Sequence, residues 1–277
     1  MIILIPGAGS SGADIFLPPN MPMSGIISGE PYFKTFGEDF ESMGFDTFVC
    51  PKNHHEDQAS IEERMKMCQV EIAKINPCVT HESAFVLGHS LGGIVAMDLV
   101  TADQLNSKPQ LSCVKAIVTI STPFKGTELG DFVLEQENAD TVYGRTLRFF
   151  HYTSQNNRYL AETTTNHRYV LSDSVHVPIY SIANNMSPDR LDFLAPTQKI
   201  IADRISSKDT NADTRNDGIV PTRSMIAGQL IGIVNATHFE SACLSIYAGS
   251  SGCADVRALL KGFFKKTVGL SDQLEER

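Results

Sequence analysis

Six short runs of apolar, mostly β-branched residues recur along the chain, with helical patterns between them. The runs are Ile2–Pro6, Thr47–Cys50, Ala84–Gly88, Val114–Ser121, Pro178–Ala183 and Leu230–Val234. Runs that are apolar on both faces are typical of strands in a parallel sheet that helices cover on both sides. The clearest helical patterns are Tyr32–Met43, Ser60–Ile75, Leu91–Ala102 and Ala254–Phe264. This alternation predicts an α/β fold with a mostly parallel sheet of about six strands.

The chain has 277 residues, which suits a single α/β domain over 1–277 with insertions. Two long segments interrupt the alternation, Ala13–Gly29 and Thr127–Val177. Loops of this length in a compact domain are usually functional or mobile. We expect both segments above the carboxyl ends of the strands, where α/β sheets bind ligands.

The formal charge of −9 argues against a nucleic-acid partner, because phosphates would be repelled. It argues more weakly against docking on anionic membranes. No apolar run is long enough to cross a bilayer. The opening "MIILIPGAG" lacks the basic start of an export signal and its apolar run stops at Pro6, so we interpret it as a strand.

The cysteine count is even, which permits disulfides, and no CxxC motif is present. Two pairs would each close a short loop and are the first to test, and the other two cysteines resemble small apolar residues at strand positions. The pairs are Cys68 with Cys78 and Cys243 with Cys253, and the other two are Cys50 and Cys113. Reduced, buried thiols remain the alternative.

The stretch "FVLGHSLGG" places Ser90 between a predicted buried strand and an apolar helix. Gly88 and Gly92 lie two residues to either side, as G-x-S-x-G requires, because a serine on a sharp strand–turn–helix needs small neighbours where the chain passes itself. The turn lifts the hydroxyl clear of the sheet, and the helix N-terminus favours an oxyanion. We interpret Ser90 as a nucleophile, and the alternative is a plain glycine-rich corner.

A nucleophilic serine needs a base, and the base needs an acid that orients it. The histidines that follow Ser90 are His151, His167, His176 and His238. Only His238 comes just after the last predicted strand, where a loop can bring an imidazole to the serine; a solvated loop histidine is the alternative. For the acid, Asp217 in "RNDGIVP" is favoured over three nearby aspartates, Asp203, Asp209 and Asp213. The stretch "SSKDTNADTR", which contains the last two, is typical of a solvated loop.

An oxyanion hole needs two N–H donors, one after the nucleophile and one after the first strand. We assign them to Leu91 and to Ala8 in "IPGAGSSG". The latter stretch lacks a full G-x-G-x-x-G and has no acidic residue at the end of the next strand, so we set a dinucleotide site aside.

Five segments lie between residues 2 and 241 and so span most of the chain: "IILIPGAG", "GHSLGG", "STPFKGTELGDF", "NDGIVP" and "THFES". They resemble the motifs of the bacterial triacylglycerol lipases of the Pseudomonas/Burkholderia type, a branch of the α/β-hydrolase superfamily. The resemblance implies an α/β-hydrolase fold, a catalytic triad of Ser90, Asp217 and His238, and a lid over 127–177. It also implies a secreted or periplasmic protein that makes transient contact with a lipid interface. Neither a redox nor an organic cofactor is required by this chemistry.

The resemblance further implies a structural calcium ion near the histidine, but the residues depart from the family pattern. Glu240 fills one of the acidic positions, whereas Ala195 in "FLAP" replaces the other carboxylate. Asp192 lies close by in sequence and could substitute. Since a hard cation needs several oxygens, the lost acid weakens the case for calcium. The family's disulfide cysteine after the acid motif is also absent, and Arg223 stands there.

These observations predict a serine carboxylic-ester hydrolase of the lipase or esterase type that forms an acyl-enzyme. The segment "NNRYLAETTTNHRYV" makes the predicted lid polar, which favours small-molecule or short-chain esters over long triacylglycerols. A phospholipase or an acyltransferase would use the same triad. A non-catalytic homologue that acts as a binding module is the rival of another class, and such proteins usually lack a triad residue.

Overall fold

The computed structural model describes residues 1–7, 33–51, 60–137, 159–161 and 176–268. It confirms the predicted sheet, which has six strands paired in parallel in the order β2-β1-β3-β4-β5-β6. The strands are β1 (Ile2–Ile5), β2 (Thr47–Val49), β3 (Ala84–His89), β4 (Val114–Ile120), β5 (Ile179–Asn184) and β6 (Gln229–Val234). Each observed strand lies within about one residue of its predicted bounds.

The strand order has one reversal, between β1 and β3. The chain passes from β1 to β2 at one edge, returns to β3 on the other side of β1, and then adds strands in sequence to β6. Loops that leave the carboxyl ends of the two strands at such a reversal diverge and form a crevice. The segments that follow these two strands begin with Pro6 and Ser90. The topology thus places the predicted oxyanion loop beside the predicted nucleophile.

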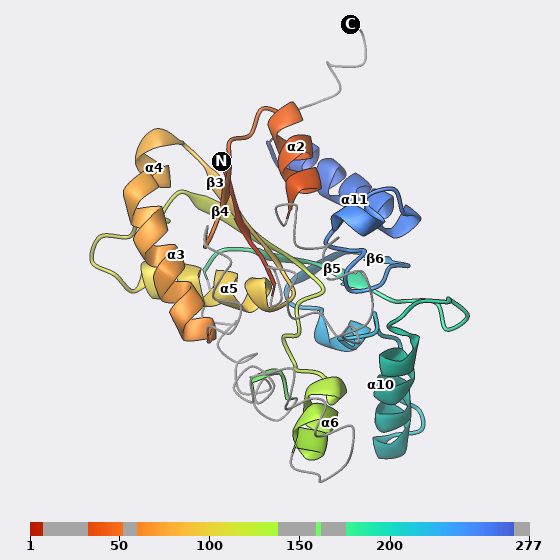
Figure 1. Cartoon of the computed structure of the whole chain (residues 1–277). Coiled ribbons are helices and arrows are strands. Elements are labelled where there is room, and N and C mark those ends of the chain that lie inside the picture. The colour runs from red at the N-terminus through yellow and green to blue at the C-terminus, as the bar shows by residue number, and fades with distance from the viewer. Residues whose placement is uncertain (8–32, 52–59, 138–158, 162–175, 269–277) are drawn as a thin grey trace, which may run out of the picture.

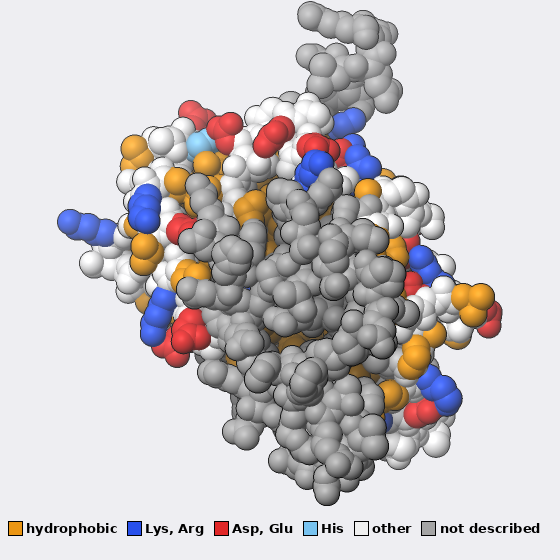
Figure 2. Space-filling view, viewed as in Figure 1, with side chains coloured by type: hydrophobic (Ala, Val, Ile, Leu, Met, Phe, Trp, Pro, Cys, Tyr) orange, Lys and Arg blue, Asp and Glu red, His pale blue; other side chains and the backbone are white. Residues whose placement is uncertain are grey.

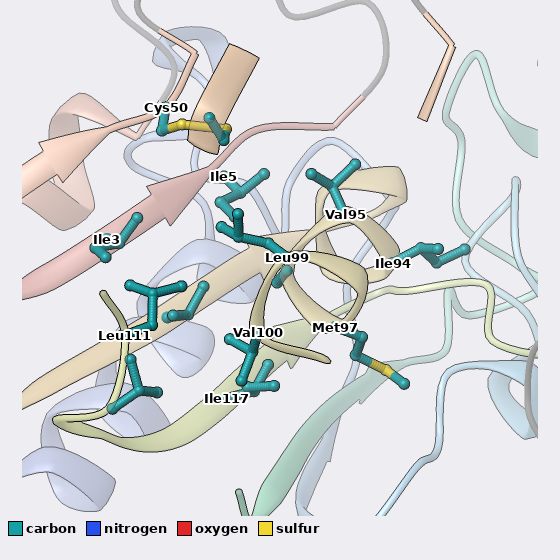
Figure 3. Packing of buried hydrophobic residues seen from close by; sticks show 14 of the residues in the cluster. Ile3, Ile5, Cys50, Ile94, Val95, Met97, Leu99, Val100, Leu111 and Ile117 are labelled. Atoms are coloured by element: carbon teal, nitrogen blue, oxygen red, sulfur yellow. A yellow bond between two sulfur atoms is a disulfide. The ribbon is translucent and has the colours of Figure 1, made fainter. Parts of the chain in front are cut away.

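Helices cover both faces of the sheet (Figure 1). The helices on one side are α3 (Ile61–Ile75), α4 (Pro77–Thr80) and α5 (Leu91–Gln104), and those on the other are α2 (Lys34–Ser42) and α11 (Ser251–Val268). Side chains alternate along β1, so that Ile3 and Ile5 pack towards α5, as Figure 3 shows, whereas Ile2 and Leu4 pack among the phenylalanines of the opposite face. The central strands are therefore buried on both sides, which explains their unbroken apolar sequences.

A local capping motif marks one helix end, and ion pairs join two other helices. The predicted capping box at the start of α3 is present, with the Ser60 hydroxyl accepting from the Glu63 N–H and the Glu63 carboxylate accepting from the Ser60 N–H. Helices α2 and α11 are joined by Asp39, which pairs with Arg257 at 2.6 Å and with Lys261 at 2.8 Å. These ion pairs hold α11 against α2.

Helices α6 (Glu128–Glu137) and α10 (Ala195–Lys208) were not among the clearest helical patterns in the sequence. They lie side by side beyond the sheet (Figure 1), with Leu129 and Val133 packed against Ile201 and Ile205. The start of the 127–177 segment is therefore helical.

Residues 138–158 and 162–175 of the predicted lid lie outside the described residues, so the lid stays a prediction. Two short 3-10 helices complete the described elements, Thr222–Ser224 and Ser245–Tyr247.

The structure corrects one of the two predicted disulfides. Cys243 pairs with Cys253 as expected, but Cys68 does not pair with Cys78. The remaining bonds are Cys50–Cys68 and Cys78–Cys113. The prediction failed because it favoured short loops, whereas β2 and α3 bring distant cysteines together. The residues taken as apolar strand positions, Cys50 and Cys113, are the missing partners.

One face of the molecule carries charges of both signs where the structure describes it. Figure 2 shows acidic and basic side chains interspersed around the described rim of one face, rather than gathered by sign. Among the described helices, none combines the length and the apolar character that crossing a bilayer requires.

Candidate active site

Ser90 lies on the sharp turn between β3 and α5. Its backbone has φ 54° and ψ −130°, a strained combination for a residue with a side chain. The Ser90 N–H donates to the Ile120 carbonyl at 2.8 Å, which ties the turn to β4. A Cβ on Gly88 would lie 2.5 Å from the Gly92 carbonyl oxygen, and one on Gly92 would overlap the carbonyl of Ile5. The two glycines are therefore required by close backbone packing, as the motif predicts.

The imidazole of His238 lies between Ser90 and Asp217. Its Nε2 is 2.9 Å from the Ser90 Oγ, and its Nδ1 is 2.7 Å from an Asp217 carboxylate oxygen. A carboxylate only accepts, so Nδ1 carries the proton and Nε2 is left to accept from the hydroxyl. The structure thus brings together the three residues that the sequence selected, in the tautomer that a general base needs.

Asp217 is fully buried and its carboxylate is held by backbone groups. The N–H groups of Ile219 and Val220 donate to one carboxylate oxygen at 3.0 and 2.8 Å, which leaves the other oxygen for His238. The His238 N–H also donates to the Asp217 carbonyl at 3.0 Å. Asp217 and His238 are therefore fixed to each other through both backbone and side chain.

His89, directly before Ser90, contacts both the backbone and the ring of His238. Its Nε2 donates to the His238 carbonyl at 3.0 Å and lies 3.1 Å from the Ser241 hydroxyl, and the two rings are 4.9 Å apart. Burial, then the nearby His238 ring, holds the pKa of His89 well below its usual value, so this imidazole is neutral. The Ser241 hydroxyl also contacts that of Ser121 at 2.9 Å. The sequence gives no signal for this buried polar network.

Of the two predicted oxyanion donors, Leu91 and Ala8, the structure describes only Leu91. Leu91 is the buried first residue of α5, where N–H groups have no acceptor within the helix. Ala8 lies outside the described residues. The chain just before it is held by Arg64, a buried side chain of α3 that donates to the carbonyls of Pro6 at 2.8 Å and Gly7 at 2.9 Å. Nothing in the sequence singles out this arginine, which is one of several charged residues in the helical pattern Ser60–Ile75.

The predicted calcium ligands do not fit a cation site. The Glu240 carboxylate, fully buried, is already paired with the Arg190 guanidinium at 2.7 Å. One Asp192 oxygen accepts from the Leu194 N–H at 3.0 Å, and the other from the Tyr247 hydroxyl at 3.3 Å. Across the described ranges, no three acidic, histidine or cysteine side chains cluster as a metal site would require. The positive charge beside Glu240 is therefore the Arg190 guanidinium rather than a metal ion.

Arg223, the other departure from the family pattern, takes part in an ion pair. Arg223, which stands where the family has a cysteine, forms an ion pair with the buried Glu128 at the start of α6. This contact ties the segment after Asp217 to the first turn of the predicted lid region.

Comparison with known proteins bears on the fold. A family model described as the PGAP1-like alpha/beta domain matches residues 53–212, a stretch that includes Ser90 and ends before Asp217 and His238. No curated protein sequence matches the chain.

Solved structures give the same architecture over nearly the whole chain. Lipase 1 from Pelosinus fermentans superposes with a TM-score of 0.62 at 14% identity, covering 96% of this chain and 97% of that one. The Staphylococcus hyicus lipase gives 0.61 at 12% identity, covering 98% and 97%. The mature BlEst2 lipase of Bacillus licheniformis gives 0.57 at 14%, covering 93% and 91%. The chain therefore has a lipase-like α/β-hydrolase fold.

Proposed function

Because the chain belongs to the PGAP1-like alpha/beta domain family, we propose that it is a serine carboxylic-ester hydrolase that acts through Ser90, His238 and Asp217. The observation that carries the proposal is the continuous pair of hydrogen bonds from the Ser90 Oγ through the His238 ring to the Asp217 carboxylate. The α/β-hydrolase fold supports the proposal, since hydrolases of this fold use a serine on the strand-to-helix turn, followed along the chain by an acid and then a histidine, which is the chain order of Ser90, Asp217 and His238.

The reaction begins when the Ser90 Oγ attacks the ester carbonyl carbon and passes its proton to Nε2 of His238. Asp217 stabilises the resulting imidazolium through Nδ1–H. The negative charge that develops on the carbonyl oxygen is met by the N–H groups of Leu91 and Ala8. His238 then gives the proton to the departing alkoxide, so the alcohol leaves and Ser90 carries an ester.

Water completes the cycle by attacking this acyl-enzyme. His238 takes a proton from the water as the new carbon–oxygen bond forms, and returns it to the Ser90 Oγ as the acyl–serine bond breaks. The products are an alcohol and a carboxylic acid. No redox step is involved, so the sequence of steps calls for no organic cofactor.

For the substrate, we propose esters with short or soluble acyl groups, because the segment 127–177 contains the polar stretch "NNRYLAETTTNHRYV". The structural neighbours named as lipases favour a lipid ester, and placement within the Pseudomonas/Burkholderia-type triacylglycerol lipases is the narrower form of the proposal. An acyltransferase or phospholipase would retain the same acyl-enzyme and differ only in the acceptor or the ester attacked.

A chain-length series of p-nitrophenyl esters tests the proposal. The wild type should hydrolyse the short esters, and Ser90→Ala should abolish the activity. Ser207→Ala, which alters an exposed serine at the end of α10, is the matched control and should behave as wild type. Turnover that survives in Ser90→Ala would refute the triad, and a rate that peaks at long chains with activation at an interface would refute the preference for short esters.

A further inference from the structure

We propose that Arg190 is a positioning residue for His238: its guanidinium supplies the positive charge that keeps a buried carboxylate, Glu240, in the loop that carries the base. We call residues 237–244 the His238 loop. The inference rests on the proposed function, because it assigns the residue a role in placing that function's base.

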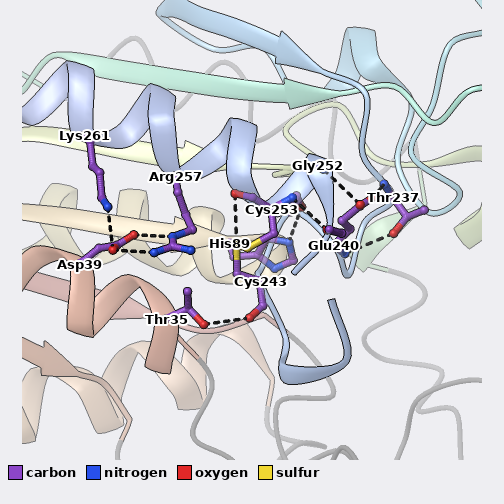
Figure 4. Close-up of a disulfide and its surroundings, with 12 residues drawn as sticks. Thr35, Asp39, His89, Thr237, Glu240, Cys243, Gly252, Cys253, Arg257 and Lys261 are labelled. Atoms are coloured by element: carbon purple, nitrogen blue, oxygen red, sulfur yellow. Dashed lines mark hydrogen bonds and ion pairs between the residues drawn. A yellow bond between two sulfur atoms is a disulfide. The ribbon is translucent and has the colours of Figure 1, made fainter. Parts of the chain in front are cut away.

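Glu240 organises the backbone around His238. The Thr237 N–H donates to one carboxylate oxygen of Glu240 at 3.1 Å, and the Glu240 N–H donates to the Thr237 hydroxyl at 3.2 Å. This reciprocal pair closes a turn with His238 inside it. The other carboxylate oxygen accepts from the Gly252 N–H at 3.2 Å, which joins the turn to the start of α11 (Figure 4).

The space around the Glu240 carboxylate is shaped for it. Its side chain is fully buried, and a Cβ on Gly252 would lie 2.5 Å from its Cδ and 2.7 Å from the Ala236 Cβ. A buried carboxylate loses its hydration, so backbone N–H groups alone leave it costly to keep ionised. The turn therefore needs a cation at this point.

Arg190 meets that need from a different part of the chain. Its Nη1 lies 2.7 Å from the Glu240 carboxylate, and its own side chain is 28% exposed, so one end of the pair keeps contact with solvent. Burial alone would raise the pKa of Glu240, but the hydrogen bonds from Arg190, Ser250 and Thr237 outweigh it and hold that pKa below its usual value. Glu240 is thus an anion in the folded protein.

The segment that contains Arg190 touches the His238 loop and its flank at two further points. The Asp192 carboxylate accepts from the Tyr247 hydroxyl at 3.3 Å, and the Phe193 ring stacks on Phe239 at 5.8 Å between centroids. Phe239 in turn lies edge-to-face against His238 at 5.7 Å. Arg190 is therefore the charged member of a contact surface that reaches the base.

This arrangement gives a physical reason for the misfit with calcium. The resemblance to calcium-binding lipases places a divalent ion beside the loop of the histidine, but here Arg190 neutralises the acid that would bind it, and Ala195 removes a second ligand. An internal guanidinium does not dissociate, so the placement of His238 should not depend on added metal.

Three variants compared with wild type test the role. Arg190→Ala removes the cation and leaves the buried Glu240 carboxylate with hydrogen-bond donors but without its positively charged partner. Arg190→Ala/Glu240→Gln removes both charges and keeps the shape. Arg204→Ala is the matched control, because Arg204 is 24% exposed and pairs with Glu135, whose side chain is 56% exposed. Hydrolysis of p-nitrophenyl butyrate gives kcat and KM, and thermal unfolding gives Tm with 1 mM CaCl2 or with EDTA.

We expect kcat to fall about 10- to 100-fold in Arg190→Ala with KM nearly unchanged. Its Tm should fall by about 5 °C or more. The double variant should recover most of the lost kcat and most of the lost Tm. Arg204→Ala should have the kcat of the wild type. Neither calcium nor EDTA should move the wild-type Tm. If Arg190→Ala does not fold, recovery of a folded, active double variant supports the proposal equally.

Wild-type kcat in Arg190→Ala, or a double variant no better than the single one, would overturn the positioning role. A wild-type Tm that rises with calcium, with the rise lost in Glu240→Gln, would show that a metal rather than Arg190 neutralises the loop. A wild type without esterase activity would instead count against the proposed function, so the two failures are distinguishable.

Discussion

The two halves of the candidate site are held in different ways. Ser90 is fixed by contiguous backbone, with β3 before it, α5 after it and glycines where the chain passes itself closely. His238 is fixed by side chains from elsewhere in the chain, which are Arg190 on Glu240, His89 on the His238 carbonyl, and the disulfide from Cys243 to Cys253 (Figure 4).

This difference separates the kinds of change that each half should tolerate. The turn at Ser90 is limited by space, so an added methyl group is more damaging there than a change of charge. The His238 loop is limited by charge and by a covalent link, so it should respond to neutralised partners, to reduction and to pH. The bonds between Ser90, His238 and Asp217 connect the halves, and their loss should have the largest effect.

Asp217→Asn should lower kcat for ester hydrolysis by about 10⁴-fold with little change in Tm. The amide can still accept the N–H bonds of Ile219 and Val220 but no longer stabilises the charged imidazole or fixes its tautomer. Steady-state kinetics with a p-nitrophenyl ester measures the effect. The control is Asp209→Asn, at an exposed position. A loss of less than tenfold would mean that Asp217 is not the acid of the site.

Gly92→Ala should lower the free energy of unfolding by about 3 kcal/mol and reduce activity with it, because the new Cβ overlaps the Ile5 carbonyl and forces the backbone apart. Gly262→Ala in α11 is the control. Apart from the chain neighbours and the helix's own backbone, nothing lies within 4 Å of its Cβ position, so this change should stabilise the protein by about 0.5–1 kcal/mol. Urea unfolding of the two variants compares them, and equal stabilities would contradict the close packing at the turn.

Removing the bond between residues 243 and 253 in Cys243→Ala/Cys253→Ala should cost about 3 kcal/mol of stability and also reduce kcat. The sequence separation of 10 sets the loop-closure entropy, and the link anchors the end of the His238 loop to α11. Cys78→Ala/Cys113→Ala is the matched comparison, with a separation of 35. It should cost about 4 kcal/mol and leave kcat unchanged in folded protein. A kcat that falls equally in both would remove the distinction between the halves.

Two groups that hold His238 in place, His89 and Glu240, should contribute to stability over different pH ranges. The folded-state pKa of His89 lies below the usual value of about 6.5, so the unfolded chain binds the extra proton first and stability falls as pH drops below that value, by up to about 1.4 kcal/mol per unit. The pKa of Glu240 is lowered from 4.5, so its contribution is full above that pH and is lost as pH falls through the folded value.

The free energies of unfolding of the wild type and of two variants, measured between pH 8 and pH 3, test these two pH dependences. His89→Gln should flatten the decline below pH 6.5, and Glu240→Gln should flatten only the decline below 4.5. Variants that each retain the full wild-type slope would show that neither group is responsible.

The same contrast explains what the sequence could predict. The turn at Ser90 is encoded by a strand, a motif and a helix that are neighbours in sequence, so its residues and their packing could be predicted. His238 and Asp217 were found because their chain order and their place after the strands are fixed by topology. Arg190 and Arg64 act through partners 50 and 57–58 residues away, and no periodicity marks them. The Cys50–Cys68 bond was missed for the same reason, since its geometry depends on how β2 meets α3.

The central claim is that Ser90 is a nucleophile activated by His238, and covalent labelling tests it most directly. Intact-protein and peptide mass spectrometry after treatment with a fluorophosphonate should place one adduct on the peptide that contains Ser90. Labelling should disappear in Ser90→Ala and slow by orders of magnitude in His238→Ala, while Ser207→Ala labels as wild type. An unlabelled wild type, or labelling at an unchanged rate in His238→Ala, would contradict the account.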